Sequence, residues 1–421
     1  MIEVLEMRIS RPLVIEHFGD ISITSPVKTL SMASSVKTGG EGYRVSMDEL
    51  IGIAEKTVIV VPVKDEDLFL FRNTLYAIPE WSPVIVVSAS PHNIFEKEVE
   101  VAKLVNEQTG KHIILVHQRD PAWSTVLTNT RLSSMLDGNG LVRYGKGEGM
   151  LLSILFSKWL GAEYIGFVDS DNYIPGSIHE YAMIYYTGFS YLNHKYSMVR
   201  IVWSHKGKLT GAYEYGEETG ISDAFIKYFI SLFGKTISGD KRVVLRRKGR
   251  VSQIVEEVLN YALSVARGIG TDIVKTPNSG EHALSTELAL NMEWAGGFSV
   301  ETYELAFLLS ECFIGSRDGS PCGFKEGVKI LQVESLNPHI HSEKGDEHLA
   351  GMLAESLGAI YYSKLNNQLV SKRIREALKM YADNAEPIKP RTYSLKGVNP
   401  VKIIEEYIAQ SKLLHQFGSR A

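Results

Sequence analysis

Four short apolar runs set the hydrophobic pattern of the first half of the chain. They are TVIVVPV at 57–63, PVIVVSAS at 83–90, HIILVHQ at 112–118 and YIGFVDSD at 164–171. The runs are rich in β-branched residues and lack the polar–apolar alternation of a half-exposed strand. Continuous runs of this kind are typical of strands buried on both faces. We therefore predict four central strands.

Helical patterns lie between these strands. Residues 93–110 carry apolar side chains at helical spacing and end at Gly110, a residue type that often terminates a helix. Residues 149–162 form a second, strongly apolar helical segment. Strands that alternate with helices predict an α/β fold with a mixed, mostly parallel sheet flanked by helices.

Polar residues follow each predicted strand. They are Lys64, Asp65 and Glu66, then Ser88 and Ser90, then Gln118 and Arg119, and finally Asp169 and Asp171. Ligands of such sheets bind at the carboxyl ends of the strands. We therefore expect these side chains to meet at one edge and to form a binding site there.

The rest of the chain divides into parts by its changing pattern. Residues 1–50 form an N-terminal extension without regular structure before Met47, residues 51–176 form the α/β half just described, residues 177–345 form a second half of mixed strand and helix, and residues 346–421 form a C-terminal helical region. A long helix is predicted at 251–270 within the second half. The chain shows no internal repeat.

Composition narrows the class of protein. The 421 residues are 44% hydrophobic and 22% charged with a net charge of −4, which is ordinary for a globular enzyme and gives no global basic field for nucleic acid. No secretory signal and no apolar run of membrane-spanning length is present. With only Cys312 and Cys322 in the chain, we expect a cytoplasmic protein, and a disulfide between the two stays open.

Asp169 and Asp171 form the first chemical motif, in the run GFVDSDNYIPG at 166–176. Residues two apart on an extended chain project from the same side, so the two carboxylates repel each other unless a cation lies between them. A divalent cation with oxygen ligands, shared with a diphosphate, is the usual partner. The alternative is a pair of turn or helix-capping aspartates, and we expect Pro175 and Gly176 to turn the chain away.

The glycine-rich run RYGKGEGM at 143–150 is the second motif. Gly145, Gly147 and Gly149 surround Lys146 and precede the apolar helix. Backbone N–H groups at a helix start, with a cation beside them, are suited to hold phosphate. The spacing is not that of a P-loop, and a flexible turn with a surface lysine is the alternative.

Two histidines form the third motif, in SLNPHIHSEKGDEH at 335–348. His339 and His341 share a side of an extended chain, and one imidazole can complete a metal site whose other ligands are oxygen. A separate zinc site with His348 is an alternative. Other candidate residues are Glu66, for a ribose or a base edge; Glu301, on a predicted strand; and Glu281 and His282, at a predicted helix start that Ser279 caps. An anionic acceptor would need two or three of the basic residues of the second half, which are Arg200, His205, Lys206, Arg246, Arg247 and Arg250.

Taken together, these strings resemble the mannosyl-3-phosphoglycerate synthase family of retaining GT-A-type glycosyltransferases. The matching pieces are VVPVKDE, HQRDP, GKGEGM, GAEYIGFVDSDNYIPG, MVRIVW, GRVSQI, NSGEHA, SVETYE and ESLNPHIH, in order from about 58 to 345. The match is weaker over the first fifty residues and at 316–327, and the stretch at 204–249 is expanded. The resemblance implies transfer of mannose from GDP-mannose to 3-phosphoglycerate with retention, giving the precursor of the compatible solute mannosylglycerate.

The resemblance also assigns roles to residues and to parts of the chain. It makes 51–176 the nucleotide-sugar-binding half and 177–345 the acceptor-binding and metal-completing half. It places Asp169 and Asp171 as the metal and nucleotide-sugar carboxylates, and Pro62, Lys64 and Glu66 on the guanosine side. Together with the residue patterns above, we predict catalytic roles for Asp169, Asp171, Lys146 and Glu301, donor binding by Pro62, Lys64, Glu66, Ser88, Gln118, Lys146, Gly147 and Asp169, and acceptor binding by Arg200, Glu281, His282 and Arg250. A divalent metal, Mg²⁺ in the first place with Mn²⁺, Co²⁺ or Zn²⁺ as alternatives, is expected on Asp171 with His339 or His341. We also expect a homodimer that binds neither nucleic acid nor membrane.

Other functions remain open at this stage. One is a related transferase with another donor or acceptor, such as a glucosyl-3-phosphoglycerate synthase. Another is a non-catalytic nucleotide-sugar-binding protein. A sugar-1-phosphate nucleotidyltransferase is disfavoured, because it needs a Gly- and Arg-rich loop after the first strand and VPVKDED lacks one.

Overall fold

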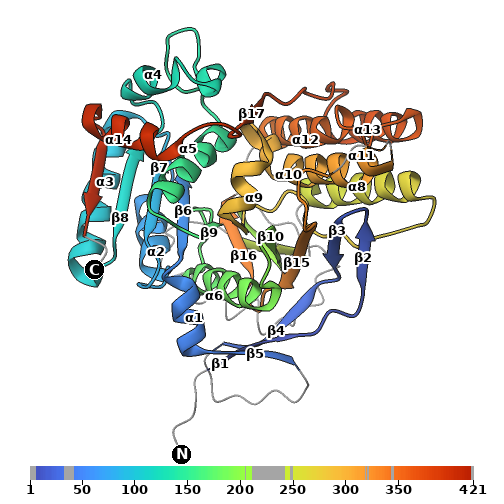
Figure 1. Cartoon of the computed structure of the whole chain (residues 1–421), viewed down its shortest axis with the longest axis horizontal. Helices are drawn as coiled ribbons and strands as arrows, with labels where there is room; N and C mark the ends of the chain where they lie inside the picture. Colours follow the sequence, from blue (N-terminus) through green and yellow to red (C-terminus); the bar gives the residue numbers. More distant parts are fainter. Residues whose placement is uncertain are drawn as a thin grey trace, which may run out of the picture.

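A large mixed sheet organises the molecule (Figure 1). The computed structural model describes residues 6–32, 42–203, 205–210, 242–246, 250–317, 319, 322–342 and 346–418. Within them, a 13-stranded sheet has the order β18-β8-β7-β6-β9-β13-β10-β15-β4-β1-β5, and β2 and β3 lie off this path.

The four predicted strands lie next to one another in this sheet and are parallel. They are β6 (Thr57–Val63), β7 (Val84–Ser88), β8 (Ile113–His117) and β9 (Tyr164–Phe167). Strand β6 lies between β7 and β9 and is parallel to both. The intervening helices are α2 (Leu68–Ala77), α3 (His92–Thr109), α4 (Ala122–Leu127) and α5 (Lys146–Trp159). Helix α3 ends as predicted at Gly110, whose φ of 72° suits glycine.

The second half continues the same sheet. Helix α6 (Pro175–Leu192) leads to β10 (Ser197–Val202), and β13 (His282–Ser285) and β15 (Val328–Glu334) follow. Strand β13 runs antiparallel to both β9 and β10, whereas β15 is parallel to β10. The predicted fold class, a mixed sheet with parallel central strands and flanking helices, is confirmed. The sheet crosses the predicted boundary at 176, and the division of the chain stays a prediction.

The N-terminal extension is structured, so the prediction of no regular structure before Met47 was wrong. It contains β1 (Glu6–Ser10), β2 (Ile15–Phe18), β3 (Ile21–Thr24), β4 (Val27–Met32) and β5 (Gly42–Ser46), followed by α1 (Met47–Ala54). These strands are short, and β2 exposes three of its four residues wholly or in part. Their hydrophobic signal is therefore weak, and pairing with β15 through β3 and β4 holds them in the sheet.

Smaller elements lie beside the main sheet. A three-stranded sheet joins β12 (Arg242–Arg246), β11 (Lys206–Thr210) and β16 (His339–Ser342), and a two-stranded one joins β14 (Glu293–Ala295) and β17 (Thr392–Ser394). The helices of this part are α8 (Arg250–Arg267), α9 (Thr286–Asn291), α10 (Val300–Leu309), α11 (Gly315–Arg317), α12 (Asp346–Tyr361) and α13 (Gln368–Tyr381). Helices α8, α10, α12 and α13 gather at one end of the molecule (Figure 1).

The chain ends on the opposite side of the molecule. Helix α14 (Pro400–Gln410) packs on α4 and α5, and β18 (Leu414–Phe417) adds an antiparallel edge strand to β8 (Figure 1).

A disulfide joins Cys312 to Cys322, a pairing that the sequence left open. In the described part of the chain, no helix combines the length and the hydrophobicity needed to cross a bilayer.

The contact between Trp123 and Tyr407 carries a testable stability prediction. The Trp123 side chain is fully buried, and its ring stacks on that of Tyr407 with centroids 3.7 Å apart. We expect Trp123→Ala to lower the free energy of unfolding by about 3–5 kcal/mol, because it removes this contact and leaves a cavity. Tyr407→Phe keeps the ring and removes only the 2.8 Å hydrogen bond to Asp120, so about 1 kcal/mol is expected. Equal losses in urea denaturation would contradict the assignment to packing.

Candidate active site

A cavity of about 600 Å³ opens where the predicted edge of the sheet faces the second half of the chain. Residues after β6 and β9, the start of α5, the first turn of α10 and strand β16 all line it. Ten residues that the sequence singled out are among its walls: Pro62, Lys64, Glu66, Gln118, Lys146, Asp169, Asp171, Glu301, His339 and His341. The edge where the polar residues were expected to meet therefore does carry a cavity.

Lys146 lies at the centre of the site. It is the first residue of α5, and its Nζ lies 2.6 Å from Asp169 Oδ1 and 2.7 Å from Glu301 Oε1. Its side chain is only 12% exposed. Burial alone would lower the pKa of Lys146, but the two carboxylates outweigh burial and hold the pKa well above its usual value. Lys146 therefore stays charged and joins three separate elements of the chain.

Two predicted local structures around this centre were wrong. Glu301 lies in the first turn of helix α10 and not on a strand, because the preceding glycines form a short 3-10 turn that leads into the helix. Pro175 does not turn the chain away, since it occupies the first position of α6, where a missing N–H costs nothing. Both helix starts follow irregular segments, whose direction the hydrophobic pattern does not specify.

Glycine is required where loops approach the Lys146 pair closely. A Cβ on Gly280 would lie 2.4 Å from Asp169 Oδ2 and 2.6 Å from Lys146 Nζ. A Cβ on Gly147 would lie 2.0 Å from the carbonyl oxygen of Ala295, which is backbone and cannot move aside easily. Gly147 thus allows α5 to start against the β14 segment, and it does not line the cavity.

Gly280→Ala is expected to separate activity from stability. The added methyl group displaces the ends of two side chains, so the pair shifts while the fold persists. We expect sugar transfer to fall about 10²-fold, the size of effect that a displacement of about 1 Å produces, with little change in melting temperature. Gly147→Ala, which meets backbone, should instead lower the melting temperature. Gly280→Ala with unchanged turnover would show that the pair need not hold this geometry.

The histidine pair lies on a strand, β16, with both side chains in the cavity wall. The ring centroids of His339 and His341 are 5.4 Å apart. Nδ1 of His339 lies 3.2 Å from Asn172 Nδ2 and 3.4 Å from Glu281 Oε1. Asp171 and His348 line the same cavity. Among the described residues, no three of these groups are already close enough to hold an ion.

Glu281 and His282 lie at the start of strand β13, so the predicted helix start was wrong there. Ser279 does not cap a helix, and its hydroxyl donates to the carbonyl oxygen of Glu281. Glu281 is fully buried behind the cavity wall, where Trp203 Nε1 donates to its Oε2 at 3.1 Å. Burial in the first place, and the charge of Asp169 in the second, raise the pKa of Glu281 to about 8.

Arg200 belongs to a buried network beneath the site. Its Nη1 donates to Glu304 Oε2 at 3.1 Å, and Nε2 of His282 lies 2.9 Å from the other oxygen of Glu304. Arg200 Nη2 also donates to the carbonyl oxygen of Pro277 at 2.8 Å. Arg200 is 1% exposed and is not part of the cavity wall. The expected contact with an anionic acceptor is thus at odds with its position, which fits a role in supporting α10.

The remaining predicted residues lie at or beyond the edge of the cavity. Ser88 lies behind the wall, next to Ser90, whose hydroxyl donates to the buried Glu98 at 2.6 Å. The side chain of Arg250 lies outside the described residues, but its neighbours Val251 and Ser252 line the cavity. Most of the expanded stretch at 204–249 is also outside the described residues.

Several wall residues were not predicted. Tyr144 lies near the cations Lys64 and Arg119, 5.1 and 4.3 Å from its ring centroid, and the glycine-rich run beside it was the available signal. Arg391 reaches the wall from the C-terminal region and pairs with the buried Glu148 at 3.2 Å. No local sequence pattern predicts a partner 243 positions away.

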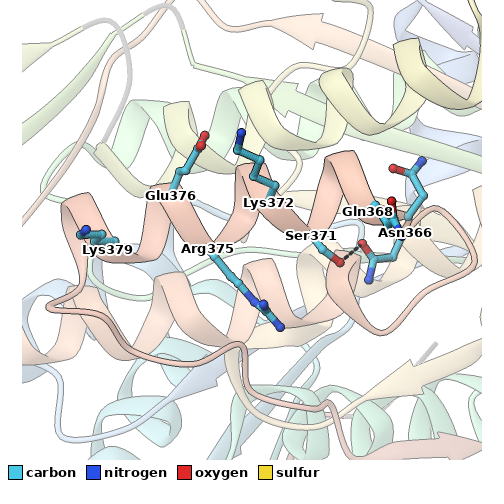
Figure 2. Close-up of a pocket in the computed structure, with 8 residues that line it drawn as sticks. Asn366, Gln368, Ser371, Lys372, Arg375, Glu376 and Lys379 are labelled. Carbon is cyan, nitrogen blue, oxygen red and sulfur yellow. Dashed lines mark hydrogen bonds between the residues drawn. The ribbon is translucent and has the colours of Figure 1, made fainter.

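A second hollow lies along α13 and contains none of the predicted residues (Figure 2). Its walls are Asn366, Asn367, Gln368, Ser371, Lys372, Arg375, Glu376 and Lys379, all from α13 and the turn before it. Lys372 and Glu376 point to one side of the helix and Arg375 to the other (Figure 2). These charged groups diverge, so the hollow does not gather groups around a ligand.

Comparison with known proteins decides the family. The family model described as mannosyl-3-phosphoglycerate synthase matches residues 11–238 and 230–406. A mannosyl-3-phosphoglycerate synthase of Aeropyrum pernix is 44% identical over 416 residues, which cover 98% of this chain and 100% of the relative. The chain belongs to the mannosyl-3-phosphoglycerate synthase family. It is therefore an enzyme, a hexosyltransferase, as the sequence motifs predicted.

Further comparisons agree with this assignment or add fold neighbours. The mannosyl-3-phosphoglycerate synthase of Pyrococcus furiosus is 33% identical over 428 residues, 98% of this chain and 100% of that protein. Among solved structures, glucosyl-3-phosphoglycerate synthase from Mycobacterium tuberculosis in complex with Mn²⁺, UDP-glucose and phosphoglyceric acid is 16% identical with a TM-score of 0.44, covering 88% of this chain and 98% of that one.

Proposed function

We propose that this enzyme transfers mannose from GDP-mannose to the 2-hydroxyl of 3-phosphoglycerate, with the anomeric configuration retained. Family membership over nearly the whole chain supports the reaction. The observation that carries the proposal in the structure is the Lys146–Asp169–Glu301 cluster in the cavity wall. It combines a fixed cation with two carboxylates at the start of a helix, where backbone N–H groups favour phosphate.

The donor would lie along the first half of the cavity. Pro62, Lys64 and Glu66 form the wall after β6 and would face the nucleoside, with Gln118 beside them. Lys146 and the N-terminus of α5 would face the diphosphate. Asp169, which also pairs with Lys146, would face the ribose or the transferred sugar. The nucleoside, the diphosphate and the sugar would thus lie in this order along the wall from β6 to β9.

A divalent metal would be held by Asp171 with His339 or His341. One carboxylate and two imidazoles that face the same cavity are a chemically suitable donor set, more so for Mn²⁺ or Co²⁺ than for Mg²⁺ by ligand type. When bound, such an ion supplies positive charge to the departing diphosphate. Asn172 and Glu281, both near Nδ1 of His339, would orient that ring.

The chain's own groups account for the rest of the reaction. Lys146, locked by two carboxylates, holds positive charge at a fixed place and so stabilises charge that develops on the leaving group. A front-face reaction, in which the departing phosphate takes the proton of the acceptor hydroxyl, fits a cavity whose described wall residues include none that is set up as a nucleophile.

The acceptor would lie between the start of α8 and the loop before β13. Ser252, Asn278 and Gly280 line this part of the cavity, and Arg250 opens the same helix. A helix start with a neighbouring arginine is suited to a phosphate group.

The expectation that the enzyme is a homodimer stays a prediction.

Product analysis tests the proposal. The protein is incubated with GDP-mannose, Mg²⁺ and 3-phosphoglycerate, and products are identified by mass spectrometry, with EDTA as the control. We expect a mannosylated phosphoglycerate and GDP, and loss of both with EDTA. Release of GDP without that product would contradict the acceptor assignment, and turnover only with GDP-glucose would contradict the donor assignment.

A further inference from the structure

Lys206 is a third ammonium in the cavity wall, after Lys64 and Lys146, and the reaction described above gives it no task. It opens strand β11 and pairs in register with His339 on the parallel strand β16. Paired residues of neighbouring strands project from the same side of a sheet. Both side chains line the cavity accordingly, so Lys206 stands beside a candidate metal ligand.

Trp203 holds Lys206 in place. The Lys206 Nζ lies 3.9 Å from the centroid of the Trp203 ring, a close cation–π contact. The indole is itself fixed, because it is 3% exposed and its Nε1 donates to Glu281. The ring of Trp203 also lies 5.2 Å from the ring of His339. The ammonium of Lys206 thus contacts an indole ring that is itself held in place.

Lys146 and Lys206 differ in how their charge is used. Lys146 is bound by two carboxylates at 2.6 and 2.7 Å. Lys206 forms no ion pair of this kind with any residue in the described part of the chain. Burial lowers the pKa of Lys206, while Glu281, Asp169, Asp171 and Glu301 act against burial from a distance. Its ammonium therefore lies near the carboxylates of the site but is not bound directly by any of them.

We propose that Lys206 binds an oxyanion of a substrate at the point of sugar transfer. The inference rests on the proposed function, which brings two oxyanions there: the diphosphate of the donor and the carboxylate next to the acceptor hydroxyl. A partly buried ammonium that no carboxylate of the described residues binds makes strong charge-assisted hydrogen bonds to such groups. The nucleoside end is excluded, because Lys206 adjoins His339 and not the wall after β6.

Isothermal titration of two ligands tests the inference. Wild type, Lys206→Met and Lys206→Arg are each titrated with GDP and with 3-phosphoglycerate, in the presence of Mg²⁺. Lys206→Met should weaken one of the two ligands about 10- to 100-fold, and Lys206→Arg should recover part of that loss. Weaker GDP binding assigns the contact to the diphosphate, and weaker 3-phosphoglycerate binding assigns it to the acceptor.

A matched control removes an ammonium of the same kind elsewhere. Lys195 also lies over an aromatic ring, 5.2 Å from the centroid of Tyr196, and does not line the cavity. Lys195→Met should bind both ligands as wild type does. Circular dichroism checks folding, and Lys206→Gln, which keeps a polar end, takes the place of Lys206→Met if that variant does not fold.

The result that overturns the inference is affinity for both ligands within twofold of wild type in the folded variant. This failure is distinct from failure of the proposed function, because the titrations need no turnover. A wild type that binds the ligands but makes no mannosylated phosphoglycerate contradicts the function alone. A wild type that binds neither ligand overturns both.

Discussion

Asp171→Asn should reduce mannose transfer by about three orders of magnitude while the protein stays folded. Asp171 is the proposed carboxylate ligand of the metal, and it is 7% exposed in the cavity wall. A metal contributes several kcal/mol to the stabilisation of developing charge, which corresponds to a loss of this size. Initial rates with saturating GDP-mannose, Mg²⁺ and 3-phosphoglycerate measure the effect.

Metal binding gives a second readout for the same variant. Titration of Mn²⁺ into the GDP complex, followed by electron paramagnetic resonance, should show weaker binding by Asp171→Asn than by wild type. Asp48→Asn is the control, because Asp48 is an exposed residue in the first turn of α1. Near-normal turnover and Mn²⁺ affinity in folded Asp171→Asn would rule out Asp171 as a ligand.

Lys146→Met should lower the rate of transfer by about 10²–10³-fold, the loss seen when one fixed donor to a developing anion is removed. The variant also leaves Asp169 and Glu301 facing each other without the ammonium that joins them. Glu301 is 8% exposed, so its uncompensated charge should also lower the free energy of unfolding by about 1–3 kcal/mol.

A second substitution separates these two effects. Lys146→Arg retains the positive charge but not the position of a single Nζ between two carboxylates. Stability should therefore recover more than the rate does. Chemical denaturation and initial rates of both variants provide the comparison. A rate that recovers fully with arginine would show that charge alone, and not the fixed position, is what the reaction needs.

The parallel strands and the site edge could be predicted because burial on both faces leaves an unambiguous sequence signal. The run at 57–63 is strand β6 to the residue, and the helix predicted to end at Gly110 does so. Polar residues that directly follow such strands must lie at the carboxyl edge of the sheet. The sequence therefore predicts one wall of the cavity, from Pro62 to Asp171.

The opposite wall depends on contacts between distant segments. Glu301 is on a helix and Glu281 leads into a strand, the reverse of what local patterns indicated. Arg200 looked like an acceptor ligand because isolated arginines are usually exposed, but Glu304 compensates its charge inside the core. Arg391 and Trp203 join the site only through tertiary packing. Residue spacing along the chain carries no information about such pairings.

The linkage and configuration of the product test the central claim most directly. The purified product of GDP-α-mannose and 3-phosphoglycerate is examined by ¹H–¹³C NMR, which reports both the anomeric configuration of mannose and the carbon that bears it. The account predicts α-mannose on the oxygen of C2. A β-linked mannose, or mannose on any other group of the acceptor, would contradict it.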